Sequence, residues 1–251
     1  MKFVAIIPSR YASSRFPGKP LIDINGKPMI QRVYEQVNKS ISEVYVATDD
    51  ERILQAVINF GGNAVMTSTS HRSGTDRCNE AFDIIDKPFD VVINIQGDEP
   101  FIFPEQVDLL KSCFVDSSIE IATLVKPFEQ DESYDVLKDP STPKVVLSDN
   151  SEAIYFSRSI IPFIRDVEPS DWLTHHVFYK HIGIYGYRAD VLSKITQLKT
   201  GVLEKSESLE QLRWLENGFK IKTGITNQET IGIDTPEDLM NALKHMKNWD
   251  Y

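Results

Sequence analysis

Short apolar, β-branched runs alternate with amphipathic segments through residues 3–115 of this 251-residue chain. The runs at residues 3–8, 43–48, 64–67 and 90–96 predict strands, and the first of them, FVAIIP, is typical of a strand buried on both faces. Between and after these runs, apolar residues recur at helical spacing across residues 27–37, 51–62 and 75–85, and a further helix is predicted at residues 105–114. Because strand and helix alternate, the sequence predicts an α/β fold with a mostly parallel central sheet and right-handed crossovers.

The chain after residue 115 predicts a smaller region that is rich in strands. The strands expected there lie at residues 119–125, 144–148, 153–157, 181–187, 219–225 and 230–233. Residues 126–143 and 162–178 carry Pro, Asp and Ser and are expected to be loops. A helix is predicted at residues 207–218, and a last one after Thr235, its expected N-cap. This length does not force a second domain, so we expect a single domain over residues 1–251.

Charge and composition argue against several classes of protein. Lys and Arg total 27 against 37 Asp and Glu, so the net charge is -10 and the pI is about 5.0. Nucleic-acid and anionic-membrane binding would need a basic face, so neither is expected. No apolar run approaches the roughly 18 residues of a membrane span, and no signal peptide is recognisable, which predicts a soluble cytoplasmic protein. Cys78 and Cys113 lack metal-binding spacing and are expected to be reduced, buried thiols.

The loop after the first predicted strand is cationic in an otherwise acidic chain. Residues 6–20, IIPSRYASSRFPGKP, contain Arg10, Arg15 and Lys19 and no carboxylate. The carboxyl end of a strand is where open α/β sheets bind ligands, and exposed backbone N–H groups there can reach a phosphate. The loop matches neither the P-loop nor the dinucleotide-binding motif. It therefore predicts a site for a small anion, with a solvated basic loop as the alternative.

Two carboxylates follow predicted strands elsewhere in the chain. Asp98, in QGDEP, follows the strand at residues 90–96, and Asp234 follows the strand expected at residues 230–233. Taken singly, Asp98 could belong to a plain turn and Asp234 could cap a helix. Mg²⁺ prefers one or two carboxylates plus substrate phosphates. Together with the cationic loop, the two aspartates therefore predict a metal-triphosphate site.

A series of motifs extends this prediction along nearly the whole chain. In order they are IIPSRYASSRFPGKPL, INGKPMI, VATDDERI, SGTDR, VINIQGDEP, YFSR, KHIGIYGYR, LEQLR and IDTPEDL. From residue 3 to about residue 246 the chain closely resembles the 3-deoxy-manno-octulosonate (Kdo) cytidylyltransferases. The resemblance implies a Rossmann-like nucleotidyltransferase fold, a homodimer, Mg²⁺ as cofactor, and CTP and Kdo as substrates. The implied products are CMP-Kdo, for lipopolysaccharide biosynthesis, and pyrophosphate.

The resemblance also implies a role for individual residues. Residues 1–115 would form the nucleotide-binding half and residues 120–225 the sugar-binding and dimerisation half. The implied nucleotide-binding residues are Pro8, Arg10, Ser13, Arg15, Lys19, Ser73, Gly74, Arg77 and Gln96, of which Lys19, Arg10 and Arg15 would be catalytic. The implied sugar-binding residues are Gln96, Arg158, His181, Tyr185, Glu210 and Gln211. Asp98 and Asp234 would be the metal ligands, and Thr75 would start its helix.

Several alternatives stay open on the sequence alone. The sugar could be a related acid sugar, such as 8-amino-Kdo or sialic acid, and the chain could be a catalytically silent nucleotide-binding protein. Among single residues, Arg77 could be a surface cation, Arg158 an ion-pair residue, His181 a satisfied strand histidine and Tyr185 a packing residue. Asp49 and Asp50 are expected to cap the helix that follows them, and His175 and His176 are expected to be loop histidines. Ser9 stands where the resemblance leads us to expect Ala, and Asp139 and Pro143 also depart from its pattern.

Overall fold

The computed structural model describes residues 1–12, 16–230 and 232–246. These residues form two compact units, one made of residues 1–108 with the segment from residue 230 onward, and one made of residues 109–229. The predicted site residues Ser13 and Arg15 lie outside the described residues, as does Ile231 of the expected late strand.

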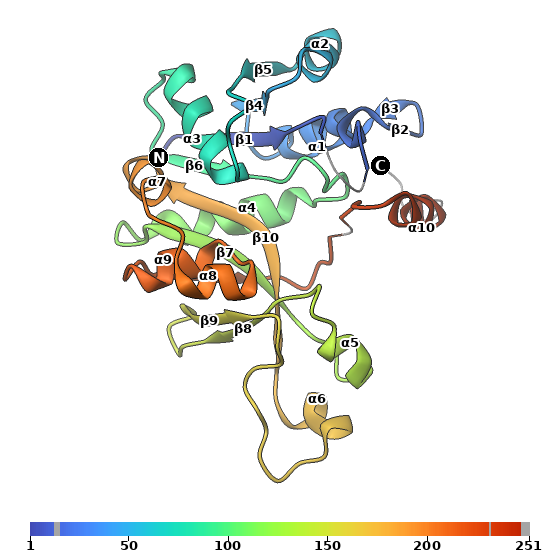
Figure 1. Cartoon of the computed structure of the whole chain (residues 1–251), viewed down its shortest axis with the longest axis vertical. Coiled ribbons are helices and arrows are strands. Elements are labelled where there is room, and N and C mark those ends of the chain that lie inside the picture. Colours follow the sequence, from blue (N-terminus) through green and yellow to red (C-terminus); the bar gives the residue numbers. More distant parts are fainter. Residues whose placement is uncertain (13–15, 231, 247–251) are drawn as a thin grey trace. The chain divides into compact units, whose positions relative to one another are not determined.

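The first unit is built on a parallel sheet in the order β6-β1-β4-β5. Its strands are β1 (Phe3–Ser9), β4 (Val44–Thr48), β5 (Asn63–Met66) and β6 (Val91–Asn94). Ile6 lies between its register partners Tyr45 and Asn94. Val4 and Ile7 are fully buried, as continuous apolar strands covered on both faces should be. All of these strands lie where the sequence predicted them, and Figure 1 shows them with their connecting helices.

The helices of the first unit follow the predicted apolar periodicity. They are α1 (Met29–Asn38), α2 (Glu51–Asn59), α3 (Gly74–Ile85) and α10 (Pro236–Met246), while α4 (Pro104–Ser112) runs from the first unit into the second. Asp50 caps α2 as predicted, because its carboxylate accepts from the backbone N–H of Arg52. Asp49 does not share this role: its carboxylate pairs with Arg77, 2.7 Å away.

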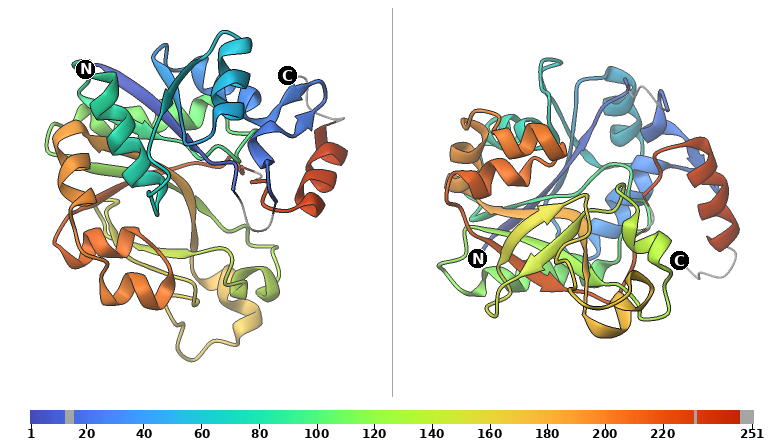
Figure 2. Two further views of the ribbon diagram at one scale, coloured as in Figure 1. Left: turned by 45° about the horizontal axis from the view of Figure 1, so that its top comes forward. Right: turned by 60° about the horizontal axis from the view of Figure 1, so that its bottom comes forward.

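Helix α10 begins with the predicted cap. Thr235 Oγ1 accepts from the backbone N–H of Asp238, whose carboxylate accepts from the backbone N–H of Thr235 in return. The helix packs on a cluster that includes Ile24 and Met29. Both views in Figure 2 show it beside the hairpin of β2 (Asp23–Ile24) and β3 (Lys27–Pro28). The late strand was a wrong prediction for its described residues: Thr230, Gly232 and Ile233 pair with no strand. The hydrogen bond from Ile233 N to the backbone oxygen of Asp98 holds Ile233 instead.

The second unit is a mixed sheet in the order β11-β7-β10-β8-β9. Its strands are β7 (Ile121–Pro127), β8 (Lys144–Leu147), β9 (Ala153–Ser157), β10 (Tyr179–Arg188) and β11 (Ile221–Ile225). Strands β7 and β11 are parallel, and the other pairings in this unit are antiparallel. Taken with the first unit, these pairings confirm a mixed α/β fold with a mostly parallel sheet.

The helices of the second unit were only partly predicted. They are α5 (Tyr134–Lys138), α6 (Trp172–His175), α7 (Ala189–Thr196), α8 (Val202–Glu207) and α9 (Gln211–Glu216), with single turns at η2 (Cys113–Val115) and η3 (Pro169–Asp171). The sequence predicted α9 but missed α7 and α8, and it assigned loops where α5 and α6 form. Figure 1 shows α6 within the long connection from β9 to β10. A cluster of Phe128, Leu137, Trp172, Leu173 and Phe178 holds these short helices.

No helix among the described residues is both long enough and apolar enough to cross a membrane. Cys78 is buried, as predicted, whereas the prediction is wrong for Cys113, which is only half-buried in the single turn after α4.

Candidate functional site

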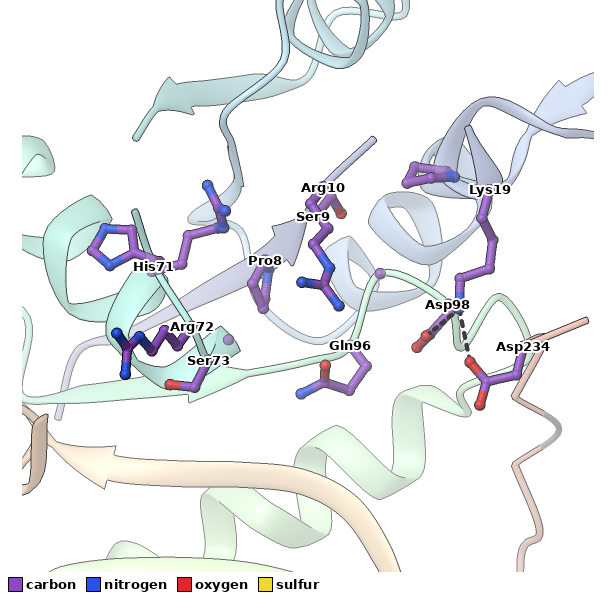
Figure 3. A pocket seen from close by; sticks show the side chains of 14 residues that line it. Pro8, Ser9, Arg10, Lys19, His71, Arg72, Ser73, Gln96, Asp98 and Asp234 are labelled. Atoms are coloured by element: carbon purple, nitrogen blue, oxygen red, sulfur yellow. Dashed lines mark hydrogen bonds and ion pairs between the residues drawn. The ribbon is translucent and has the colours of Figure 1, made fainter. Parts of the chain in front are cut away.

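The first unit carries a polar pocket at the carboxyl ends of β1 and β6. Its cavity measures about 240 Å³. The residues lining it are Pro8, Ser9, Arg10, Lys19, Pro20, His71, Arg72, Ser73, Gly74, Arg77, Gln96, Gly97, Asp98 and Asp234 (Figure 3). Every described residue that the sequence assigned to the nucleotide or the metal is in this set. The pocket thus lies where ligands bind in open α/β sheets.

One end of the pocket is an ion triad made by three distant parts of the chain. The ammonium of Lys19 lies 2.6 Å from Asp98 Oδ2 and 3.0 Å from Asp234 Oδ1 (Figure 3). Lys19 opens the single turn η1 (Lys19–Leu21) after Gly18, whose positive φ of 72° favours glycine, and it is only 8% exposed. The predicted convergence of these three side chains is confirmed.

The capping alternative for Asp234 is wrong. Thr235 is the residue that caps α10, and the Asp234 carboxylate turns to Lys19 instead. Because the Ile233 N–H binds the backbone oxygen of Asp98, the two aspartates are held in one place by the main chain as well as by Lys19. The site therefore has two carboxylates that already face a single cation.

This pair of carboxylates fits a divalent cation that also takes ligands from the substrate. Among the described residues no group of three or more His, Cys, Asp or Glu side chains could hold a metal. Asp98 and Asp234 would supply two oxygens, and phosphate oxygens and water would complete the shell, as Mg²⁺ prefers. Glu99 is less suited to join them, because burial, and then the neighbouring charge of Asp98, raises the pKa of its carboxyl to about 8.

The other end of the pocket is formed by the start of α3. Ser73 is the N-cap, and its hydroxyl accepts from the backbone N–H of Asp76 at 3.1 Å, so the helix begins at Gly74 rather than at the predicted Thr75. Gln96 reaches this pocket from the loop after β6, where its amide lies 3.5 Å from Asn94 Oδ1. The Gln96 side chain therefore lies beside the N-terminus of α3 at this end of the pocket.

Arg77 is a buried anchor and not the surface cation that the sequence allowed. It is 4% exposed, and its guanidinium donates to Asp49 Oδ2 at 2.7 Å and to Thr67 Oγ1 at 2.6 Å. Its Nη1 also lies 3.4 Å from the backbone oxygen of Ser68. Arg77 therefore ties the loop before α3 to the end of β4 while it lines the pocket.

A close approach of two loops fixes the position of Asp98. A Cβ at Gly97 would lie 2.3 Å from Ser9 Oγ and 3.1 Å from the backbone oxygen of Pro8. Within the described part of the chain, the buried Ser9 hydroxyl has no hydrogen-bond partner. Only glycine at position 97 lets the two loops pack this closely.

The predicted sugar-binding residues belong to the second unit, where two of them lie in β10. His181 Nε2 is 3.1 Å from Thr123 Oγ1, and its ring lies against Phe156 and Tyr185. Burial lowers the pKa of His181 to about 4, so the imidazole is neutral at neutral pH. Burial, and then the charge of Glu210, raises the pKa of Tyr185 well above its usual range. The contacts of His181 are therefore those of a strand histidine with a hydrogen-bond partner, and the contacts of Tyr185 are those of a packing residue.

The remaining sugar-binding candidates surround the start of α9. Arg158 donates its guanidinium hydrogens to the backbone oxygens of Glu207, Pro140 and Ser208. Its guanidinium makes no ion pair with a carboxylate of the described residues, so the ion-pair alternative is wrong for this part of the chain. Glu210 lies 3.5 Å from Arg213, and the nearly buried Gln211 has an amide nitrogen without a hydrogen-bond partner in the described residues. A buried amide of this kind is suited to a polar ligand.

We expect His181 to make the protein acid-sensitive. The unfolded chain takes up this proton near pH 6.5 and the folded chain only near pH 4, so the unfolded state binds more protons between these values. Stability should therefore fall as the pH drops through this window, by up to about 3 kcal/mol for His181 alone at about 1.4 kcal/mol per pKa unit.

Urea unfolding at pH 7 and pH 4.5 measures this loss. The variant His181→Gln should lose clearly less stability over the same interval than the wild type. Equal losses in the two proteins would show that His181 does not titrate in this way.

The comparisons with known proteins identify the family. The sequence profile of the cytidylyltransferase family matches residues 4–222. The 3-deoxy-manno-octulosonate cytidylyltransferase of Parabacteroides distasonis is 64% identical over 249 residues, which cover 99% of each chain. The chain belongs to the family of 3-deoxy-manno-octulosonate cytidylyltransferases. The member of this family from Bacteroides thetaiotaomicron is 61% identical, again over 99% of each chain.

Solved structures agree with this family and its fold. The structure of a CMP:2-keto-3-deoxy-manno-octonic acid synthetase complexed with CTP matches at a TM-score of 0.90 and 44% identity, over 99% of both chains. A 4-diphosphocytidyl-2C-methyl-D-erythritol synthase from Anaerococcus prevotii matches at a TM-score of 0.62 but only 15% identity, and it shows the fold alone. The predicted nucleotidyltransferase fold is confirmed.

The site of this cytidylyltransferase also contains residues that the sequence did not single out. His71 and Arg72 line the pocket directly before SGTDR, and Gly97 lies within QGDEP. Their nearness to quoted motifs was the available signal. The ligand-binding roles of the predicted residues stay predictions.

Proposed function

We propose that this chain transfers the CMP group of CTP to Kdo and releases pyrophosphate, the activity that gives its relatives their name. The ion triad is the observation that carries the proposal. It combines the ammonium of Lys19 and two carboxylates in a pocket suited to a charged, metal-loaded triphosphate. The product, CMP-Kdo, would serve lipopolysaccharide biosynthesis.

In this reaction the C2 hydroxyl oxygen of Kdo forms a bond to the α-phosphorus of CTP, and the bond from that phosphorus to the β-phosphate oxygen breaks. The hydroxyl proton would pass to solvent. No described residue is assigned as a general base. Lys19 and Arg10 would offset the charge that develops on the leaving phosphates. Orientation would supply much of the rate, because the close approach of Gly97 to Ser9 fixes the loop that carries Asp98.

We propose Mg²⁺ as the cofactor, held by Asp98 and Asp234. Bound there, it would neutralise part of the triphosphate charge. Ser13 and Arg15 are proposed to contact the triphosphate, Ser73, Gly74 and Arg77 to frame the cytosine, and Pro8 and Gln96 to contact the nucleoside. Arg158, His181, Tyr185, Glu210 and Gln211 are proposed, together with Gln96, to bind the sugar.

The family resemblance supports three further proposals. We propose that the protein is a homodimer and acts in the cytoplasm. We also propose that residues 1–115 serve nucleotide binding and that residues 120–225 serve sugar binding and dimerisation.

Pyrophosphate release tests the proposed reaction. Purified protein is mixed with Mg²⁺ and CTP, and then with Kdo, 8-amino-Kdo or sialic acid in separate reactions. We expect the largest kcat/KM with Kdo and one pyrophosphate for each CMP-sugar formed. A larger kcat/KM with another sugar would replace Kdo as the substrate, and CTP binding without pyrophosphate from any sugar would show a catalytically silent protein.

A further inference from the structure

His71 lies in the pocket wall at the end away from the ion triad. Figure 3 shows His71, Arg72 and Ser73 at one end of the pocket, and Lys19 with its two carboxylates at the other. If the triphosphate lies against Lys19, the nucleoside must extend toward His71.

Glu80, in the second turn of α3, holds the imidazole of His71. His71 Nε2 lies 2.5 Å from Glu80 Oε2, and the same oxygen accepts from the backbone N–H of Ser68 at 2.7 Å. Arg77, one turn earlier on α3, binds Thr67 and Ser68. The loop that carries His71 is therefore fastened to one helix at two points, so the ring is placed before any ligand binds.

The contact with Glu80 also decides which ring nitrogen carries the proton. A carboxylate only accepts hydrogen bonds, so Nε2 of His71 must be the donor. In the neutral imidazole this leaves Nδ1 as an acceptor. Within the described residues, the one hydrogen bond to the ring is at Nε2.

We propose that His71 is a specificity-determining residue that accepts a hydrogen bond through Nδ1 from the nucleoside of the substrate, with Glu80 as the residue that positions it. The inference rests on the proposed function. Two nucleoside groups have the required chemistry, the exocyclic amino group of cytosine and a ribose hydroxyl. Uracil presents a carbonyl oxygen in place of that amino group and could not donate.

Calorimetric binding of CTP, UTP and 2′-deoxy-CTP without sugar tests this inference. His71→Ala should weaken CTP binding about tenfold, as expected for one lost hydrogen bond, and Glu80→Gln by about threefold. The double variant should bind CTP no more weakly than His71→Ala, since both changes remove the same contact. His175→Ala, which removes an exposed histidine of α6, is the matched control and should bind like the wild type.

The nucleotide panel separates the two donors. If the donor is the cytosine amino group, His71→Ala weakens the binding of CTP and leaves the binding of UTP unchanged. Glu80→Gln then changes the ratio of the CTP and UTP affinities in the same direction. If the donor is a ribose hydroxyl, CTP and UTP weaken equally, and an unchanged affinity for 2′-deoxy-CTP identifies the 2′-hydroxyl.

Two results would overturn the inference. One is a CTP affinity of His71→Ala within twofold of the wild type. The other is a combined result in which both single variants have a lowered melting temperature and bind all three nucleotides more weakly by the same factor. In that case His71→Asn, which keeps a side-chain acceptor, would also fail to recover the affinity for CTP. A wild-type protein that binds no CTP would instead overturn the proposed function itself.

Discussion

The variant Lys19→Met is expected to fold and to release pyrophosphate from CTP and Kdo at least about 10²-fold more slowly than the wild type. The reason is that a preorganised charge in a site shielded from water is worth about 10²–10³ in kcat. Lys19 is nearly buried and is the ammonium between the two carboxylates. Steady-state pyrophosphate release measures the effect.

The same variant should change metal binding in the opposite direction. With Lys19 removed, Asp98 and Asp234 lose the cation that they share, so Mn²⁺ without nucleotide should bind more tightly than to the wild type. Lys87→Met is the matched control, because it removes the same charge from an exposed pair with Glu43. Activity of Lys19→Met near that of Lys87→Met would remove Lys19 from the mechanism.

Gly97→Ala is expected to lower both activity and stability. Its Cβ would have to lie 2.3 Å from Ser9 Oγ and 3.1 Å from the Pro8 backbone oxygen, so the loop that carries Asp98 must move. Overpacking of this kind costs about 1–3 kcal/mol, and a shift of about 1 Å at a catalytic group costs about 10² in rate. Thermal unfolding and pyrophosphate release measure the two losses.

Two variants test the cause of these losses. Gly232→Ala should be nearly silent, because no atom of the described residues lies within 4 Å of its Cβ. In Gly97→Ala with Ser9→Ala, the nearest clashing atom is gone and part of the stability should return. A double variant as unstable as Gly97→Ala would show that Ser9 is not the obstacle.

The sequence was a good guide wherever periodicity was strong. β1, β4 and α1 are continuous or regularly spaced apolar segments, and each was predicted within a residue or two. The polar loops that follow β1 and β6 then predicted that Lys19 and Asp98 lie close together, since the carboxyl ends of neighbouring parallel strands meet at one edge of the sheet.

The failures concern short helices and pairings between distant residues. α5 and α6 have five and four residues, too few to show a helical period, and tertiary packing on Trp172 and Phe178 holds them. The partner of Arg77 is Asp49, 28 residues earlier, and nothing local in the sequence assigns that pair. Asp234 was expected to follow a strand, but Thr230, Gly232 and Ile233 form none; the hydrogen bond from Ile233 N to the backbone oxygen of Asp98 and the ion pair with Lys19 hold Asp234 instead.

Substitutions that remove the charge of a carboxylate but keep its shape give the most direct test of the ion triad as the catalytic centre. Pyrophosphate release is measured with CTP, Kdo and Mg²⁺ for the wild type, Asp98→Asn and Asp234→Asn, each shown to be folded by its thermal transition. We predict that turnover is lost in Asp98→Asn and strongly reduced in Asp234→Asn. Near-normal turnover in both folded variants would contradict the account.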